Sequence, residues 1–257
     1  MTNNFNYSKE GFHVKNGVLV KFVPDEYYAY HDSLGVLVIP EGVTEIGEDA
    51  FTQCECGDNA EDFCGVFGLY KVTLPSTCTV LRRAAFYSCR DLREIKFLTK
   101  IELIESAVFS DCPNLKDFVE IPDTQDTIPC FLYNSGGLSK VDIPHHIKII
   151  EESAFYDDVN LEEVNFNKVE VIEEDSFFKC SFSKGITLPP TVKEVHSNAF
   201  GWTIPPFIKI QSLNSKISED AFDDINTVKT LYVPKGFELS KDLWGISNPE
   251  DVEVIEE

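Results

Sequence analysis

The apolar residues of the chain follow one recurring pattern, in which a short apolar stretch ends in a Phe that follows a small residue. We call this Phe position the anchor. Successive anchors are 35, 23, 23, 23, 22, 23 and 22 residues apart, a mean of about 22.7 once a 12-residue excess in the first step is removed. Such a period predicts stacked structural repeats. The anchors, with Leu132 filling the one place without Phe, are Phe51, Phe86, Phe109, Leu132, Phe155, Phe177, Phe200 and Phe222.

Apolar and polar residues alternate before each anchor, as in residues 69–75 and 138–144, and the alternation stops at a Pro. A period of two predicts a half-buried strand, and Pro ends the strand because it lacks the N–H that a ladder needs. One such unit cannot bury its apolar face alone, so we expect the units to stack. These prolines are Pro40, Pro75, Pro122, Pro144, Pro189 and Pro234.

Two further columns repeat with the anchors. The residue directly before the anchor is Ala in five of the eight repeats, as a tightly packed inner corner requires. Five residues before the anchor the side chain is apolar in all repeats but one, and the repeat around Thr127 and Leu132 is the most degenerate. This column reads Ile46, Leu81, Ile104, Thr127, Ile150, Ile172, Val195 and Ile217.

The two ends of the repeat array predict caps. Residues 12–20 alternate around Asn16 and Gly17, which is the strongest short hairpin signal. We therefore expect one domain over 1–257, with an N-terminal hairpin cap at 1–35, repeats at 36–227 with an insertion near 57–68, and a C-terminal cap at 228–257. Within that last cap, residues 231–234 form a final strand, and the stretch from Leu239 to Ile255 is expected to fold over the open end.

The combined pattern, a strand ending in Pro, then Val-x-x-Ile, then Ala-Phe-x-x-Cys-x-x-Leu, resembles the BspA-type leucine-rich repeat family. Clear copies run over 36–54, 69–89 and 138–161, and the similarity covers about 36–228. The resemblance implies a leucine-rich-repeat solenoid (right-handed α/β superhelix class) that is β-rich, with parallel strands, short turns, little helix and about eight repeats of 22–23 residues. It also implies a cell-surface or secreted protein of bacteria or protists that binds host or neighbouring-cell proteins.

Charge narrows the possible partners. The chain has 44 acidic and 22 basic residues and a formal net charge of −22. Nucleic acid and anionic lipid need a cationic face, so both are disfavoured. No apolar run reaches the roughly 20 residues of a membrane helix, and no signal peptide or anchor is visible at the start of the sequence. We expect a monomer that binds a protein with a basic patch.

Cysteine offers the first candidate chemistry, with eight residues. Cys54, Cys89, Cys112 and Cys180 share a repeat column that suits a small buried side chain, so we predict reduced thiols. Cys54, Cys56 and Cys64 lie close enough in sequence to be weak candidates for a zinc site. Their spacing matches no familiar zinc motif and no nearby His completes it, so no metal site is predicted.

Catalytic motifs are absent from the sequence. His145 and His146 follow Pro144 at a turn, where adjacent side chains diverge, and the other His residues accompany no triad or phosphate-loop pattern. Acidic pairs such as Glu151-Glu152 and Asp223-Asp224 recur at turns and are expected to face water. We predict no enzyme activity and no cofactor.

Three surface rows remain as candidate binding positions. The aromatic row Tyr87, Tyr133, Tyr156 and Phe178 follows the anchors, and bracing of the turns is favoured over ligand binding. One outward strand row pairs opposite charges at Lys71–Glu94, Asp117–Lys140 and Lys140–Glu163, which predicts cross-strand stabilisation. The other outward row has no such ladder, so its members are the protein-binding candidates, namely Lys96, Asp142, Asn165, Thr187 and Tyr232.

Together these features predict a non-catalytic protein-recognition scaffold, and the family resemblance implies the adhesion or host-interaction type. The alternative is a structural or self-associating repeat module without a dedicated ligand. Repeats supply an extended binding surface without any catalytic chemistry, which favours the recognition scaffold over the structural module.

Overall fold

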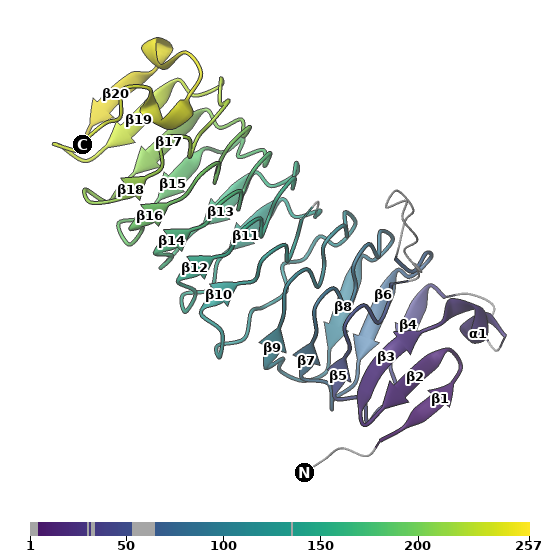
Figure 1. Cartoon of the computed structure of the whole chain (residues 1–257). Coiled ribbons are helices and arrows are strands. Elements are labelled where there is room, and N and C mark those ends of the chain that lie inside the picture. The colour runs from purple at the N-terminus through teal and green to yellow at the C-terminus, as the bar shows by residue number, and fades with distance from the viewer. Residues whose placement is uncertain (1–4, 30, 32–33, 53–64, 135) are drawn as a thin grey trace. The chain divides into compact units, whose positions relative to one another are not determined.

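The structure, a computed structural model, describes residues 5–29, 31, 34–52, 65–134 and 136–257. The chain divides into two compact units, unit 1 (Met1–Thr124) and unit 2 (Gln125–Glu257), and each is described by itself (Figure 1). The metal candidates Cys54, Cys56 and Cys64 lie outside the described residues, as does most of the insertion near 57–68. The expectation of one domain with two caps stays a prediction.

The described residues of unit 1 form two sheets and one short α-helix, α1 (Pro24–Tyr28). The larger sheet has the order β1-β2-β3-β5-β7-β9 and the smaller has the order β4-β6-β8. The strands are β1 (Tyr7–Lys9), β2 (Phe12–Lys15), β3 (Val18–Phe22), β4 (Val36–Val38), β5 (Glu45–Ile46), β6 (Lys71–Leu74), β7 (Val80–Leu81), β8 (Glu94–Phe97) and β9 (Leu103–Ile104).

Unit 2 has three sheets, with the orders β10-β12-β14-β16-β18, β11-β13 and β15-β17-β19-β20. Two 3-10 helices, η1 (Leu243–Gly245) and η2 (Pro249–Asp251), precede the last strand. The strands are β10 (Thr127–Ile128), β11 (Lys140–Asp142), β12 (Ile149–Ile150), β13 (Glu163–Asn165), β14 (Val171–Ile172), β15 (Ile186–Leu188), β16 (Glu194–Val195), β17 (Phe207–Ile210), β18 (Lys216–Ile217), β19 (Thr230–Val233) and β20 (Glu253–Glu256).

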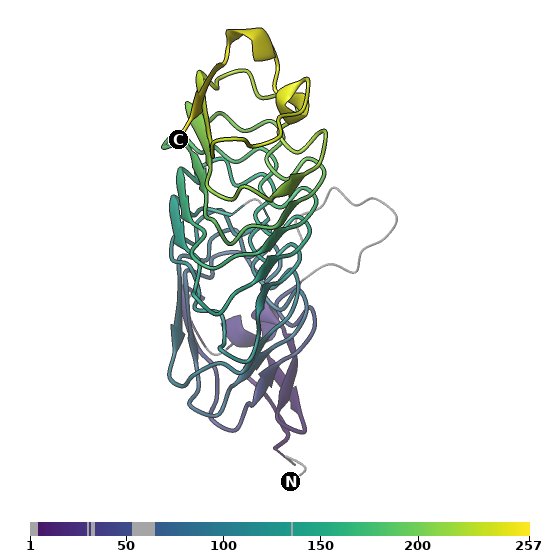
Figure 2. The ribbon, with the colours of Figure 1, turned by 90° about the vertical axis from the view of Figure 1, so that its left-hand side faces the viewer.

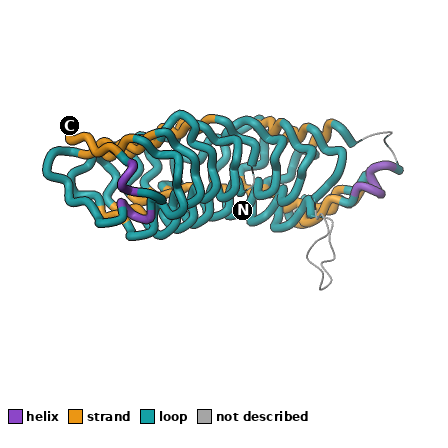
Figure 3. The backbone as a smooth tube through the Cα atoms, turned by 90° about the horizontal axis from the view of Figure 1, so that it is seen from above, coloured by secondary structure: helices purple, strands orange, loops and turns teal. Residues whose placement is uncertain are grey.

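The coils of each unit place strands on two sides, with turns between them (Figures 2 and 3). We call the side formed by β4-β6-β8 in unit 1, and by β11-β13 and β15-β17-β19-β20 in unit 2, the strand face. The side with the two-residue strands (β5, β7 and β9 in unit 1; β10, β12, β14, β16 and β18 in unit 2) is the second face. Neighbouring coils pair in parallel, for example Val141 with Val164, and helix is rare among the described residues. The predicted solenoid of parallel strands and short turns is therefore confirmed.

A tight corner follows each second-face strand and carries the anchor. Two places before the anchor the backbone is left-handed, with φ between 50° and 57° from Asp49 to Asn198. The anchor N–H then donates to the next coil, as from Phe155 to the Ser176 carbonyl at 2.8 Å and from Phe177 to the Ala199 carbonyl at 2.9 Å. Within each unit, neighbouring coils are thus tied together at the corner by backbone bonds of the same kind.

The degenerate repeat is shifted by one residue from the expected alignment. Phe131 has the left-handed φ of 54°, and the Tyr133 N–H donates to the Ala154 carbonyl at 2.9 Å. In the second face Ile128 pairs with Ile150. Tyr133 and Ile128 therefore occupy the columns that the sequence analysis assigned to Leu132 and Thr127. Leu132 is fully buried in the place that Ala takes elsewhere.

The core of each unit is a column of stacked rings. In unit 1, Phe51 and Phe86 lie 4.8 Å apart between ring centroids, and Phe22 of β3 adds a ring 5.3 Å from Phe51. In unit 2 the column runs from Tyr133 through Phe155, Phe177 and Phe200 to Phe222, at spacings of 5.1–5.8 Å. These rings are nearly or fully buried. Each contributes roughly 1.5–3 kcal/mol by burial, so the column is a major part of the core of each unit.

The terminal elements differ in how they end the stack. At the front, β2 and β3 form an antiparallel hairpin whose turn residues Asn16 and Gly17 both have positive φ, as a type I′ turn requires. At the back, β20 pairs in parallel with β19 and so adds a strand to the sheet. The expectation that this stretch folds over the open end stays a prediction: Trp244 is buried with its ring centroid 6.2 Å from that of Phe222, whereas Val254 of β20 is 38% exposed.

Candidate functional site

The strand face of unit 2 brings together four of the five predicted binding residues. Alternation along the strands turns Val141 into the core and leaves Asp142 exposed, and the same holds for Val164 and Asn165. Asp142 pairs with Asn165 in the ladder between β11 and β13. Thr187 of β15 and Tyr232 of β19 lie on either side of Lys209 of β17.

A polar groove crosses this face where the ladder between β13 and β15 is interrupted. It has a volume of about 440 Å³, and Asn165, Asn167, Lys184, Thr187 and Gln211 line it. A second hollow of about 360 Å³ includes Lys209, Gln211 and Glu257. Gln211 borders both, so the two hollows form one continuous polar surface on unit 2.

The binding row carries more cross-coil bonding than the sequence analysis expected. The Asn167 side-chain amide donates to Asp142 Oδ1 at 2.8 Å and to the Ile143 carbonyl at 2.6 Å. The Asn167 backbone N–H donates to Asn165 Oδ1 at 3.2 Å. Asp142 therefore has a stacking role, and Asn165 holds the turn of its own coil. Thr187 and Gln211 are both exposed and are better placed for contact with a partner.

The fifth predicted residue, Lys96, lies on β8 in unit 1, where it is exposed and pairs with Thr73 of β6. Lys209, Asn167 and Gln211 were missed. Lys209 had a sequence signal, because Thr187 and Tyr232 are two repeat periods apart and Lys209 stands midway between them. Asn167 and Gln211 follow the strands in irregular turns, where periodicity gives no position.

The charged row on the strand face forms ion pairs across neighbouring strands. Lys71 pairs with Glu94, and Lys140 Nζ lies 2.6 Å from Glu163 Oε1. Lys209 adds a pair to Glu257 of the C-terminal segment, at 2.5 Å. The third expected pair, Asp117–Lys140, would join the two units and stays a prediction. Such exposed pairs contribute roughly 0.2–1 kcal/mol each and favour the observed register.

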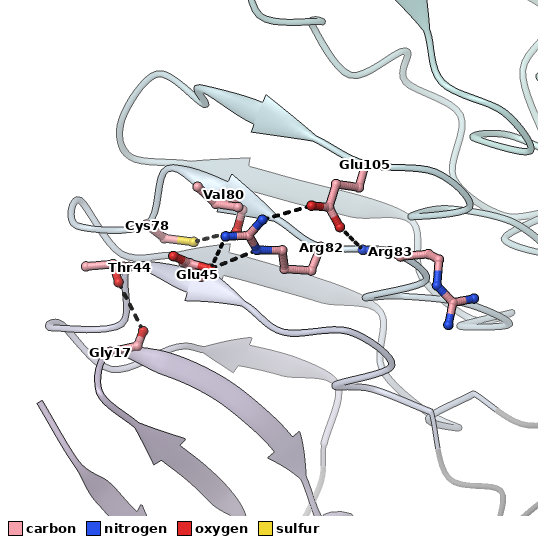
Figure 4. A network of polar contacts seen from close by, with 8 residues as sticks. All are labelled: Gly17, Thr44, Glu45, Cys78, Val80, Arg82, Arg83 and Glu105. Carbon is pink, nitrogen blue, oxygen red and sulfur yellow. Dashed lines mark hydrogen bonds and ion pairs between the residues drawn. The ribbon is translucent and has the colours of Figure 1, made fainter. Parts of the chain in front are cut away.

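The second face of unit 1 holds a network centred on Arg82 (Figure 4). The Arg82 guanidinium lies 2.7 Å from Glu45 and 2.8 Å from Glu105, so it bridges the coils on both sides. Burial raises the pKa of Glu105, but hydrogen bonds from Arg82 and the Arg83 N–H outweigh this effect and hold that pKa below its usual value. This network joins three neighbouring coils and stabilises the stack.

The corner carboxylates also have structural roles, and this corrects the expectation that they only face water. Glu151 accepts the Cys130 N–H at 2.9 Å, and Glu173 accepts the Glu152 N–H at 3.1 Å. Glu105 accepts the Arg83 N–H at 2.9 Å in the same repeat position. These carboxylates satisfy corner N–H groups of the preceding coil, which explains why acidic residues recur there.

The described cysteines are free thiols and most are buried. The Cys112 thiol donates to the Phe86 carbonyl at 3.2 Å, and the Cys180 thiol to the Phe155 carbonyl at 3.1 Å. Burial raises the pKa of both thiols well above the usual value and raises that of Cys89 to about 12. Thiols in this state are poor nucleophiles and poor metal ligands.

Among the described residues no group of three or more His, Cys, Asp or Glu side chains is arranged to hold a metal ion. His145 is exposed at its turn, and His146 is half-buried. Within the same described part of the chain, no helix has the length and apolar character needed to cross a bilayer. In unit 1 an apolar pocket between Phe97, Ile101 and Ile121 has a volume of only about 80 Å³, far below that of typical cofactor sites.

The aromatic row beside the corners differs in membership from the expected one. Tyr133 belongs to the buried ring column, so it is not part of this row. Tyr156 and Phe178 stack with ring centroids 5.2 Å apart, which is consistent with bracing of adjacent corners. Trp202 extends the row, 6.3 Å from Phe178.

A sequence model of the BspA type leucine rich repeat region matches six copies over residues 21–118, 59–184 and 116–229. The chain belongs to the BspA-type leucine-rich repeat family. This family and its fold are typically non-catalytic and support a repeat scaffold for protein interaction. A search among curated proteins found no match to the chain.

Solved structures show the same fold at low sequence identity. A leucine-rich repeat protein from Eubacterium ventriosum is 20% identical with a TM-score of 0.55, and the match covers 85% of this chain and 59% of that one. One from Bacteroides ovatus is 19% identical with a TM-score of 0.51, covering 100% and 78%. The T. pallidum leucine-rich repeat protein is 20% identical with a TM-score of 0.51, covering 80% and 86%. BspA-type repeats thus account for the fold, and the chain spans about three fifths of the first of these structures.

Proposed function

We propose that this BspA-type repeat protein is a non-catalytic recognition scaffold that binds a protein partner through the strand face of unit 2. The observation that carries the proposal is the continuous polar surface formed by the two hollows around Thr187 and Gln211. Amide, hydroxyl and ammonium groups gather there on strands and on the turns that flank them, as specific but non-catalytic binding requires. The family favours an adhesion or host-interaction role at a cell surface.

Charge indicates the kind of partner. The net charge of −22 attracts a protein with a basic patch, and this long-range attraction speeds association at low ionic strength. We expect association to slow as salt is added, since counterions screen exposed charges beyond roughly 8–10 Å. The strand-face contacts then determine how long the complex lasts.

The test compares two double variants that change the net charge equally. Thr187→Arg with Gln211→Arg places bulk and positive charge in the groove, whereas Asn214→Arg with Asn226→Arg places them on exposed turns of unit 2. Partner capture from extracts of host or neighbouring cells is expected to fall at least roughly tenfold for the groove variant only. Both melting temperatures should stay near that of the parent protein, because all four positions are surface positions.

Equal capture by all three proteins would overturn the role of the groove. Light scattering over a concentration series separates the alternative function. Mass that rises with concentration, in a protein that captures no partner, would instead identify a self-associating structural module.

A further inference from the structure

Trp202 is the most exposed aromatic residue at the corners of unit 2, with 55% of its surface accessible. It ends the row that begins with the stacked rings of Tyr156 and Phe178, which are both half-buried. Tryptophan is enriched where protein surfaces bind one another because its large ring gives much contact area at low entropic cost. An indole in this position therefore calls for a physical explanation.

The backbone at Trp202 argues against a purely structural explanation. Its φ is +58°, and the equivalent corner position, two places after the anchor, is also left-handed in five other coils. Those coils carry small, acidic or flexible side chains there, namely Ser88, Asp111, Asp157, Lys179 and Asp224. A bulky ring is disfavoured in this conformation, whereas Asp or Ser tolerates it. The corner would form at lower cost with another residue, so the fold does not require the indole.

The surroundings of Trp202 are aromatic and cationic on one side and acidic on the other. Lys179 Nζ lies 5.9 Å from the Trp202 ring centroid and 5.6 Å from that of Phe178, which shows that a cation can lie over these rings. The backbone N–H of Trp202 donates to the backbone carbonyl of Asp223, in the next coil, at 2.9 Å. Asp224 follows at the same corner position as Trp202 and is exposed.

We propose that Trp202 and Asp224 form a docking site for an arginine side chain of a protein partner. A guanidinium stacks on an indole face and at the same time donates to a carboxylate, which a compact ammonium does less well. The acidic net charge of the chain attracts a partner that bears such a group. This inference rests on the proposed protein-binding function and adds a second contact surface to the strand face.

The test uses the two tryptophans of the chain as internal reporters. Trp202 is exposed and Trp244 is only 4% exposed, so their two indole N–H signals in an ¹H–¹⁵N NMR spectrum distinguish the corner from the core. The probe is a capped peptide, Gly-Arg-Gly-Arg-Gly, and the control is the same peptide with neutral citrulline. We expect a saturable shift of the Trp202 signal with the arginine peptide, at least roughly fivefold tighter than with citrulline, and no shift at Trp244.

Asp224→Asn is a suited variant because Asn tolerates the left-handed backbone and removes only the charge. Asp224→Asn should lower the affinity for the arginine peptide roughly threefold to tenfold. Glu238→Gln, which removes an exposed charge elsewhere in unit 2, should leave this affinity unchanged. Trp202→Gly should abolish peptide binding while the melting temperature stays the same or rises.

Three results would overturn the proposal. These are an unmoved Trp202 signal, equal shifts with the citrulline peptide, and a marked loss of melting temperature in Trp202→Gly, which would show a bracing role. A larger shift with neutral maltohexaose than with the arginine peptide would instead identify a carbohydrate platform. The groove is tested by partner capture and the Trp202 site by peptide titration, so the two results are independent. If the arginine peptide does not bind, the proposed function still stands. If the groove variant captures its partner as well as the parent does, the Trp202 result is unaffected.

Discussion

At the corners from Asp49 to Asn198, one residue two places before the anchor adopts a left-handed backbone, and the chain mostly meets this demand with Asp, Asn, Ser or Ala. Phe131 is the exception, and it is 38% exposed. With three large residues in a row at 131–133, the usual small-then-large signature is lost. The ring of Tyr133 nevertheless completes the column, 5.8 Å from Phe155.

This alignment makes a prediction about two neighbouring buried residues. Tyr133→Ala should lower the free energy of unfolding by about 3–5 kcal/mol, because it removes a ring from the column. Leu132→Ala should cost less, about 2 kcal/mol, since Ala is what most other coils carry at that place. Urea denaturation measures both, and Tyr133→Phe, which keeps the ring, serves as the control. A larger loss for Leu132→Ala than for Tyr133→Ala would contradict the alignment.

Between strands, polar side chains join neighbouring coils on both faces. On the second face of unit 2, Glu170 lies between Lys148, at 2.9 Å, and Lys193. Hydrogen bonds from Lys193 and then Lys148 lower the pKa of the Glu170 carboxyl to about 2. Glu170 thus plays in unit 2 the bridging role that Arg82 plays in unit 1, with the charges exchanged.

The pH dependence follows from this lowered pKa. Because the folded-state pKa lies below the ordinary value of 4.5, the stabilisation is fully present above that value and is lost as the pH falls toward 2. Carboxyl ¹³C NMR should find the Glu170 midpoint near pH 2, and Lys193→Gln should raise it. The melting-temperature difference between the parent and Glu170→Gln should shrink over the same pH range. A midpoint near 4.5 would show that solvent screens these exposed pairs completely.

The elements themselves were largely predictable because two periods are superposed in the sequence. Alternation marks the strands, and the 22–23-residue repeat marks the corners, so strands such as β6 and β11 lie where the pattern indicates. The repeat around Leu132 was placed one residue off because an even step of 23 was preferred over the actual steps of 24 and 22. Lys209 was missed because Gln211, not Pro, follows its strand.

The candidate site was only partly predictable. Periodicity places Asn165 and Thr187 on one face, but it does not show that a groove opens between their strands. The bond from Asn167 to Asp142 spans 25 residues and depends on a turn that no pattern specifies. Glu151 and Glu173 look like solvent-facing acids in sequence, because their N–H partners lie in the preceding coil.

For the whole molecule, the dominant electrostatic fact is the excess of 22 negative charges. Ion pairs such as Lys140–Glu163 and Arg83–Glu48 are exposed, and such pairs contribute little individually. Self-repulsion among the remaining carboxylates opposes the compact state. Of these two opposing effects, we expect repulsion to be the larger at neutral pH.

The melting temperature at pH 7 should therefore rise as sodium chloride is added up to about 0.3 M, because salt screens the repulsion. Near pH 4.5, the isoelectric point given by the sequence, the net charge is close to zero, so sodium chloride should change the melting temperature little. Differential scanning calorimetry at both pH values gives the comparison. A melting temperature that falls with salt at pH 7 would mean that the ion pairs outweigh the repulsion.

The recurrent corner bond, from an anchor N–H to the carbonyl one place before the next anchor, also bears on how such genes can change length. Neighbouring coils are joined by the same donor, the anchor N–H, and the same acceptor, the carbonyl before the next anchor. If one whole repeat is duplicated or lost, the junctions between the remaining coils therefore keep the same hydrogen bond. Unequal recombination can then lengthen or shorten the array in steps of one coil, while an insertion of any other size must be absorbed in a loop.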